Sequence, residues 1–159
     1  MSRRNPPPEL DNVDAWRTPT ASQAAGLTLA AARRMIAAAQ ETARALRVAM
    51  SVAVVDAGDQ LVAFERMDGA DLVTIGLARD KAFSALVNRM PTRDLAPLVQ
   101  PGAEFYGYDS LAGGRMVVFA GGMPLERAAV LIGALGVSGG SADEDQQAAD
   151  AAVAALDRG

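Results

Sequence analysis

A change of hydrophobic period between residues 51 and 67 limits the fold of this chain more than any other feature. The stretch SVAVV is continuous and β-branched, whereas QLVAFERM alternates in part between apolar and polar residues. Between them, DAGD forms a tight turn in which Gly58 is available for a positive φ and the Asp56 side chain can bond to the backbone two residues on. The segment therefore predicts a β-hairpin.

Helical patterns lie on both sides of this hairpin. Residues 27–48 are amphipathic, with Thr28 as the expected N-cap. Their apolar residues recur at three- and four-residue steps: Leu29, Ala32, Ile36, Ala39, Ala43 and Leu46. At the other end of the chain, Ser141 with Glu144 three residues on has the spacing of a capping box, which predicts a final helix.

The middle of the chain returns to a helical pattern and then to strands. Residues 69–90 are helical up to Pro91, with Asp68 or Asp71 as the expected cap. Residues 115–140 contain two or three apolar strands joined by turns. Antiparallel strands with helices segregated around them predict a single-domain α+β fold, an antiparallel sheet with flanking helices.

Composition excludes several kinds of chemistry. The 159 residues include no cysteine and no histidine, which removes thiolate nucleophiles, histidine-held metals and Ser-His-Asp catalysis from this chain. A formal charge of −4 without a basic cluster argues against nucleic acid as a partner. No stretch reaches the roughly 20 apolar residues of a membrane span. We therefore expect a cytoplasmic protein with no membrane partner and no metal site.

The first 26 residues differ in composition from the rest. They are rich in Pro, Asn, Thr and Ser and show no helical or alternating period. Two interpretations remain, a disordered tail or an arm that docks through Trp16 onto its own domain or a neighbouring subunit. The expected organisation is an N-terminal arm at 1–26 and an α+β domain at 27–159.

Three segments of the chain stand out together: VAVVDAGDQLVAFERMDGA, ARDKAFSAL, and GALGVSGG followed by an acidic helix start. In their order and spacing they resemble the GlcG/HbpS-like family, which includes haem-binding HbpS proteins and the C-terminal domain of PduO-type proteins. The resemblance implies a domain related in architecture to PAS- or profilin-like sheets, a small-molecule ligand such as a tetrapyrrole, and a homo-oligomer. The apolar strands at 116–122 and 130–137 also predict an oligomer, because they supply more apolar strand than one small sheet face readily covers.

Lys81 is the one lysine among fifteen basic residues, and it lies in a helical pattern among small apolar neighbours. It matches the lysine of the family pattern A-x-x-K-A. Arginine is larger, planar and permanently charged, so it cannot replace a compact or neutralisable amine. The amine can bind a carboxylate or act as a base or Schiff-base nucleophile. The alternative is a structural lysine that bonds strand-end carbonyls or a carboxylate.

Two further groups are candidate ligand-binding residues. Arg66 and Asp68 follow the hairpin and can form a charged cluster at a pocket mouth, although helix capping is an alternative role for Asp68. Gly121 and Gly122, followed by Met123, can turn backbone N–H groups toward a ligand, or can serve as an ordinary bend. The resemblance implies that this glycine segment lies close to the ligand site.

The stretch EFYGYD carries the third group of candidates on an irregular segment. Glu104 and Tyr106 are candidates for proton transfer, and Tyr108 for ligand binding. Tyrosinate can ligate ferric haem. The alternative is a pair of rim tyrosines that pack against the arm or another subunit.

Two functions remain from the sequence. The first is a small-molecule-binding protein of the GlcG/HbpS type, with haem as the named candidate although the missing histidine argues against it. The second is an enzyme that acts on a small carboxylated or carbonyl metabolite through Lys81, a carboxylate or tyrosine, and the glycine backbone. A pocket that joins Lys81, Glu104 and the glycine pair favours the enzyme, and an open apolar slot framed by tyrosine favours a tetrapyrrole.

Overall fold

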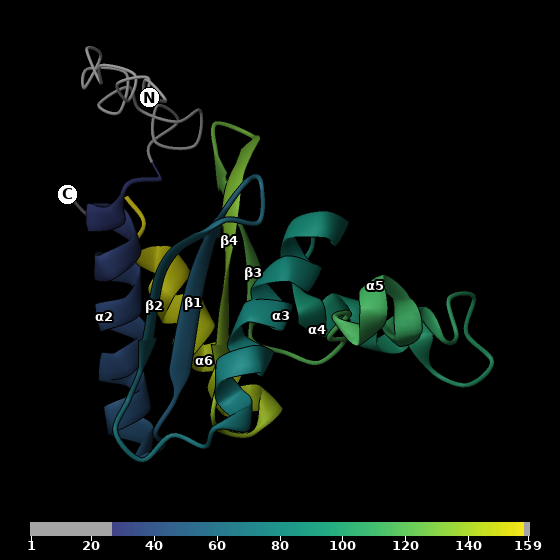
Figure 1. Cartoon of the computed structure of the whole chain (residues 1–159), viewed down its shortest axis with the longest axis horizontal. Coiled ribbons are helices and arrows are strands. Elements are labelled where there is room, and N and C mark those ends of the chain that lie inside the picture. Colours follow the sequence, from purple (N-terminus) through teal and green to yellow (C-terminus); the bar gives the residue numbers. More distant parts are fainter. Residues whose placement is uncertain (1–26, 158–159) are drawn as a thin grey trace, which may run out of the picture.

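The chain folds around a four-stranded antiparallel sheet with helices on both faces (Figure 1). The computed structural model describes residues 27–157. The strand order is β2-β1-β4-β3, so the predicted hairpin provides one edge strand and one central strand. The single-domain α+β architecture expected from the sequence is confirmed. The strands are β1 (Ser51–Asp56), β2 (Leu61–Arg66), β3 (Gly122–Arg127) and β4 (Val130–Ser138).

The helices divide into a long set that covers the sheet and a short set that follows it. The long helices are α2 (Leu29–Leu46), α3 (Val73–Asn88) and α6 (Ala142–Ala154). α2 and α6 cover one face and α3 covers the other (Figure 1). The short elements are α4 (Thr92–Leu95), η2 (Ala96–Val99), η3 (Tyr108–Ser110) and α5 (Leu111–Gly114).

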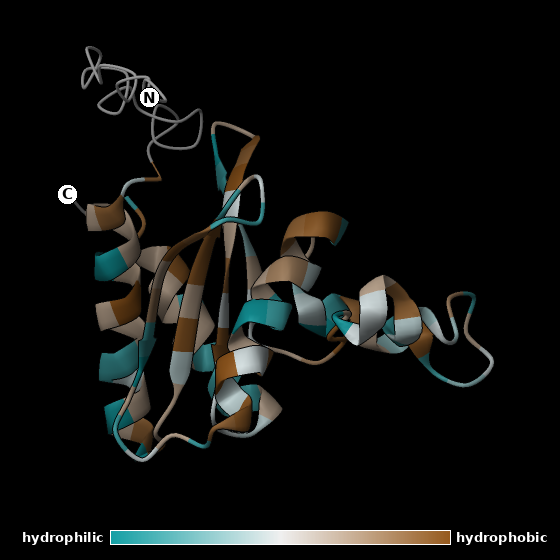
Figure 2. Cartoon of the chain, in the orientation of Figure 1, coloured by the Kyte–Doolittle hydropathy of each residue, from teal (hydrophilic) through white to brown (hydrophobic). Residues whose placement is uncertain are grey.

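Each face of the sheet has its own apolar core. Val54 packs with α2 and α6, whereas the next residue, Val55, packs against Ala82 and Ala85 of α3. This alternation follows from the period of two in a strand. In Figure 2, hydrophilic and hydrophobic segments alternate along α2, as expected for an amphipathic helix with one face on the core. Alanine is frequent at the helix contacts, so the helices approach the sheet and each other closely.

Local signals in the sequence predict the turns and caps well. The Thr28 hydroxyl caps α2, and Ser141 and Glu144 form the complete capping box of α6. Asp56 forms the hairpin turn, because its Oδ1 accepts from the backbone N–H groups two and four residues on. The positive φ falls on Asp59 (60°), so the prediction for Gly58 is wrong.

Two other local predictions are also wrong. Neither Asp68 nor Asp71 caps α3, which begins after Leu72 without a side-chain cap. Instead, the backbone carbonyl of Asp71 accepts from the Thr74 hydroxyl at 2.6 Å. Leu29, expected on the apolar face of α2, is 44% exposed because it lies at the first turn, beyond the edge of the core.

Strand β4 is covered on both faces within one chain. Seven successive residues, from Ile132 to Ser138, are buried between α3 and the pair α2 and α6. Residues 115–120 form no strand and run past α3 instead. The argument for an oligomer from surplus apolar strand therefore does not hold, and the expected oligomer rests on the family resemblance. None of the helices within residues 27–157 is long and apolar enough to cross a membrane.

The segment between α3 and β3 extends away from the sheet. Figure 1 shows α4, η2, η3 and α5 as a lobe on the side of α3 that is remote from α2. Predictions for the N-terminal arm and Trp16 concern residues outside the described range.

Candidate functional site

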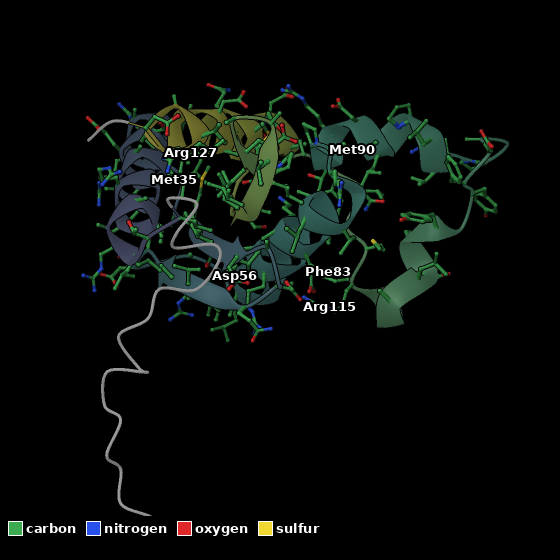
Figure 3. The ribbon with its side chains drawn as sticks, turned by 90° about the horizontal axis from the view of Figure 1, so that it is seen from above. Met35, Asp56, Phe83, Met90, Arg115 and Arg127 are labelled. Atoms are coloured by element: carbon green, nitrogen blue, oxygen red, sulfur yellow. The ribbon has the colours of Figure 1, made fainter. Side chains whose placement is uncertain are left out.

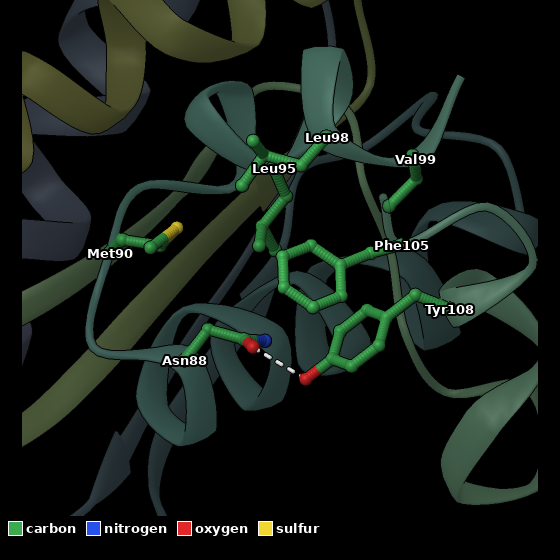
Figure 4. Close-up of a pocket in the computed structure, with 7 residues that line it drawn as sticks. All are labelled: Asn88, Met90, Leu95, Leu98, Val99, Phe105 and Tyr108. Carbon is green, nitrogen blue, oxygen red and sulfur yellow. Dashed lines mark hydrogen bonds between the residues drawn. The ribbon is translucent and has the colours of Figure 1, made fainter. Parts of the chain in front are cut away.

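An apolar pocket of about 210 Å³ lies where this lobe meets the end of α3 (Figure 4). Leu95 and Val99 form its buried wall, while Leu98 and Phe105 are 37% and 47% exposed at its rim. The lining residues are Asn88, Met90, Leu95, Leu98, Val99, Phe105 and Tyr108. A concave, mostly apolar site with few polar groups is the usual form of a small-molecule site.

One hydrogen bond supplies the polar side of this pocket. The Tyr108 hydroxyl donates to Oδ1 of Asn88 at 2.6 Å (Figure 4). Asn88 ends α3 and donates its own amide group to the carbonyl of Ser84 at 2.8 Å and to the sulfur of Met116 at 3.7 Å. Because a carbonyl oxygen only accepts, the contact with Ser84 fixes which end of the Asn88 amide faces Tyr108.

Backbone hydrogen bonds hold the aromatic wall of the pocket in place. The N–H of Phe105 donates to the carbonyl of Leu98 at 3.1 Å, and the N–H of Tyr108 donates to the carbonyl of Phe105 at 2.9 Å. Gly107 between them has φ 86°, a conformation that only glycine adopts without strain. The rings of Phe105 and Tyr108 then lie 6.2 Å apart and tilted by 60°, in the range of favourable aromatic pairs.

The other candidates of the same segment lie outside this pocket. Glu104 is exposed, and Tyr106 is 69% exposed. Tyr106 faces a shallow hollow bounded by Phe105, Gly107, Tyr108 and Leu111 instead. The structure thus places Tyr108 in the pocket and leaves its two neighbours at the surface.

Lys81 lies in a different place, buried where α3, β4 and α6 meet. Its side chain has no exposed surface, and Nζ donates to the carbonyl of Val137 at 2.9 Å and to Oδ2 of Asp145 at 2.5 Å. The ring of Phe119 lies 4.9 Å from Nζ and adds a cation–π contact. The amine therefore has partners on three sides, as a structural lysine has.

Glycines make the room that Lys81 occupies. A Cβ on Gly121, whose φ is 112°, would lie 3.0 Å from Nζ, and a Cβ on Gly136 would lie 3.0 Å from Cβ of Lys81. A Cβ on Gly122 would collide with the carbonyl oxygen of Lys81. The planar arginine head is larger than an ammonium and needs more space than these glycines leave. This crowding explains why the only lysine of an arginine-rich chain lies here.

Burial shifts the titration of both members of this pair. Burial lowers the pKa of the Lys81 ammonium, and the charge and hydrogen bond of Asp145 oppose that shift. Burial likewise raises the pKa of the Asp145 carboxyl, against the attraction of Lys81 and hydrogen bonds from the backbone of Gly140 and Gly139. Burial therefore disfavours the charged form of each side chain taken alone, and the attraction between the two charges offsets part of that cost.

The glycine segment predicted as a ligand cradle is engaged within the chain. The N–H of Gly121 donates to Gln146 at 3.3 Å, and the N–H of Gly122 donates to the Thr92 hydroxyl at 2.9 Å. The sulfur of Met123 accepts from Gln146 at 3.2 Å. Lys81 and the glycine pair therefore lie together, but their polar groups bond to Val137, Asp145, Gln146 and Thr92 and do not face an open pocket.

Arg66 and Asp68 lie at the opposite edge of the sheet. They border a polar hollow with Gln40, Arg44 and Met67, next to strand β2. Since β2 and β3 are the two edge strands, this hollow is separated by the width of the sheet from the glycine segment at the start of β3.

The predicted site residues thus fall into three places, and a catalytic role for Lys81, Glu104 and Tyr106 stays a prediction.

Arg115, which follows α5, anchors the C-terminal end of the lobe to the hairpin turn and to α3. Arg115 bonds to Asp59 in the hairpin turn and to Asp80 on α3, both at 3.0 Å. Its guanidinium carbon lies 3.8 Å from the ring centre of Phe83, and the two side chains are neighbours in Figure 3. Ser84 adds a further tie, because its hydroxyl oxygen accepts from the N–H of Val117 at 2.8 Å. The chain that returns from the lobe is therefore anchored at two points of α3.

Most of the pocket residues carry no signal in the sequence. Asn88 reads as the end of a helix, and Leu95, Leu98 and Val99 lie in a stretch with three prolines that carries no period. Composition gives the one usable signal: Leu95, Leu98 and Val99 are apolar side chains in a proline-rich connection, where apolar side chains are expected to pack against another surface.

The fold and the pocket define a small α+β protein with an apolar pocket between the end of α3 and the lobe. The family model described as "Haem degrading protein HbpS-like" matches residues 27–154. The chain belongs to this HbpS-like family, as the sequence motifs indicated.

Three relatives show how far the similarity extends. The corrinoid adenosyltransferase PduO of Salmonella typhimurium is 43% identical over 122 residues, which cover 77% of this chain and 36% of PduO. The chain thus spans about a third of that relative. A crystal structure of a PduOC:haem complex is 39% identical with a TM-score of 0.80, covering 83% of this chain and 96% of that one. The Klebsiella pneumoniae protein ORFY is 36% identical with a TM-score of 0.80, covering 82% and 90%.

Proposed function

We propose that this chain is a small-molecule-binding protein and that the pocket between α3 and the lobe is its ligand site. The observation that carries the proposal is the pocket itself, a concavity of about 210 Å³ with an apolar lining and one polar pair, Asn88 and Tyr108. Apolar cavities of about 150 Å³ are large enough to bind benzene. The pocket is therefore matched to one ring with small substituents.

Haem is the second candidate, because a PduOC structure of 39% identity is a haem complex. The lining of this pocket does not fit haem. Its volume is below the roughly 300–1,000 Å³ of pockets that enclose drug-sized ligands. Its only atoms able to ligate iron are the thioether of Met90 and the hydroxyl of Tyr108, and the latter donates to Asn88. A thioether alone is a poor anchor for ferric iron.

Titration with phenol, followed by calorimetry and ligand-observed NMR, tests the proposed site. We expect saturable binding to the full chain and its loss in Leu98→Trp, because an indole at the rim fills the apolar volume. Leu72→Trp is the matched control, since it makes the same substitution at a 74%-exposed leucine at the start of α3, the opposite end of the helix from Asn88. Phenol binding that survives in Leu98→Trp, with the variant folded, would move the ligand elsewhere.

A hemin titration followed by absorbance separates the second candidate. We expect a response that does not saturate at one haem per chain and that is unchanged in Tyr108→Phe. A stoichiometric spectrum with tyrosinate character, lost in Tyr108→Phe, would instead establish haem as the ligand and overturn the assignment to a small ring.

A further inference from the structure

We propose that the pocket selects an uncharged single-ring ligand that donates a hydrogen bond, such as a phenol or an arylamine, and rejects carboxylates. This inference rests on the proposed function, since it concerns the same pocket. It names the class of ligand that the polar pair can recognise.

The polar pair presents acceptors and no free donor. The single proton of the Tyr108 hydroxyl is directed at Oδ1 of Asn88, and the Asn88 amide N–H groups are directed at Ser84 and Met116. What remains toward the pocket are lone pairs on the Tyr108 oxygen and on Oδ1 of Asn88. A ligand hydroxyl or N–H can donate to either oxygen, whereas a ligand that only accepts leaves both unmatched.

The position of Asn88 adds to this selectivity. Asn88 is the last residue of α3, a helix of 16 residues, so the pocket lies at the negative end of the helix dipole. A carboxylate there meets an unfavourable field, and none of the lining residues is positively charged. An ammonium also loses its water without a carboxylate partner among the lining residues. Both charged classes are therefore disfavoured, and the anion more strongly.

Four probes of similar size test the inference on the full chain: phenol, anisole, toluene and benzoate. We expect phenol to bind roughly 3- to 10-fold more tightly than anisole, as one neutral hydrogen bond provides. Toluene should bind about as well as anisole, and benzoate should show no saturable binding. Leu98→Trp should abolish binding of the first three.

The outcomes distinguish the inference from the function on which it rests. If phenol, anisole and benzoate bind equally and all are lost in Leu98→Trp, the pocket is a ligand site but the proposed selectivity is wrong. If none of the four probes binds, or if binding is insensitive to Leu98→Trp, the proposed function itself fails. Tighter binding of benzoate than of phenol would reverse the inferred polarity.

Discussion

Lys81 of α3 and Asp145 of α6 form a buried ion pair that joins helices packed on opposite faces of the sheet. The Nζ–Oδ2 distance is 2.5 Å, and both side chains are almost fully removed from solvent. Asp145 also accepts from the N–H of Gly140 at 2.8 Å. The pair thereby ties the end of β4 to both helical layers.

Lys81→Met should destabilise the fold strongly. Removal of one member leaves the Asp145 carboxylate buried without its counter-charge, which costs about 3–5 kcal/mol in such pairs. Urea unfolding followed by circular dichroism measures the loss. Arg93→Met is the matched control, because the Arg93 ion pairs are about half exposed and should contribute less than about 1 kcal/mol. A Lys81→Met variant as stable as the parent would contradict the structural role of this pair and favour a functional role for Lys81.

Gly136→Ala should weaken the packing of α3 on β4. A Cβ at this position would collide with the carbonyl oxygen of Ala78 and lie 2.7 Å from the N of Ala82. Overpacking of this kind costs about 1–3 kcal/mol or more. Gly76→Ala on α3 is the opposite case, since a Cβ there meets no atom within 4 Å. It should stabilise the helix by roughly 0.5–1 kcal/mol, and thermal unfolding of both variants gives the comparison.

The capping box of α6 should make stability depend on pH in the acidic range. Hydrogen bonds from the backbone and then the hydroxyl of Ser141 lower the pKa of Glu144 from its usual 4.5. A carboxyl with a lowered folded-state pKa contributes stability that is complete above pH 4.5 and is lost as pH falls through the folded-state pKa. Parent and Glu144→Gln should therefore differ in melting temperature at pH 7 and converge in acid.

The control for the capping box is a charge removed elsewhere on a helix. Glu41→Gln lies within α2, away from any helix start. A parent-to-variant difference that stays constant from pH 7 to pH 3 for Glu144→Gln would contradict the assigned role of its carboxylate.

Tyr108→Phe should loosen the pocket wall. Loss of the hydrogen bond to Asn88 removes about 1 kcal/mol and the one side-chain hydrogen bond between η3 and the end of α3. We expect faster hydrogen exchange at the backbone N–H groups of Phe105 and Tyr108, with little change in β1 and β4. Unchanged exchange in the lobe would show that the backbone alone orders this wall.

The parts of this fold that the sequence predicts are those that depend on nearby residues. Asp56 forms the hairpin turn and Ser141 with Glu144 caps α6 because each interaction closes within four residues. The sequence does not predict the start of α3, because no side chain caps this helix and its first residue depends on tertiary contacts with the sheet. Propensity and capping patterns carry no information on such contacts.

The candidate site escaped prediction for a related reason. Lys81 is conspicuous in the sequence as the only lysine, but its partner Asp145 lies 64 residues further on, and no pattern in one sequence joins the two. The pocket is built by a non-periodic segment whose residues meet only after Phe105 folds back to Leu98. The hydrogen-bonding character of the pocket depends on the orientation of the Asn88 amide, which its hydrogen bond to the Ser84 carbonyl sets.

All the residues that line the pocket come from one stretch of chain, from Asn88 to Tyr108. Substitutions of these lining residues can reshape the cavity without changing the strand pairing, because none of them belongs to a strand, whereas the buried Thr92 in the same stretch accepts from the N–H of Gly122 in β3. The proposed ligand pocket and the strand pairing therefore depend mainly on different residues, so a change in the lining residues alters what the pocket can hold while the sheet is kept.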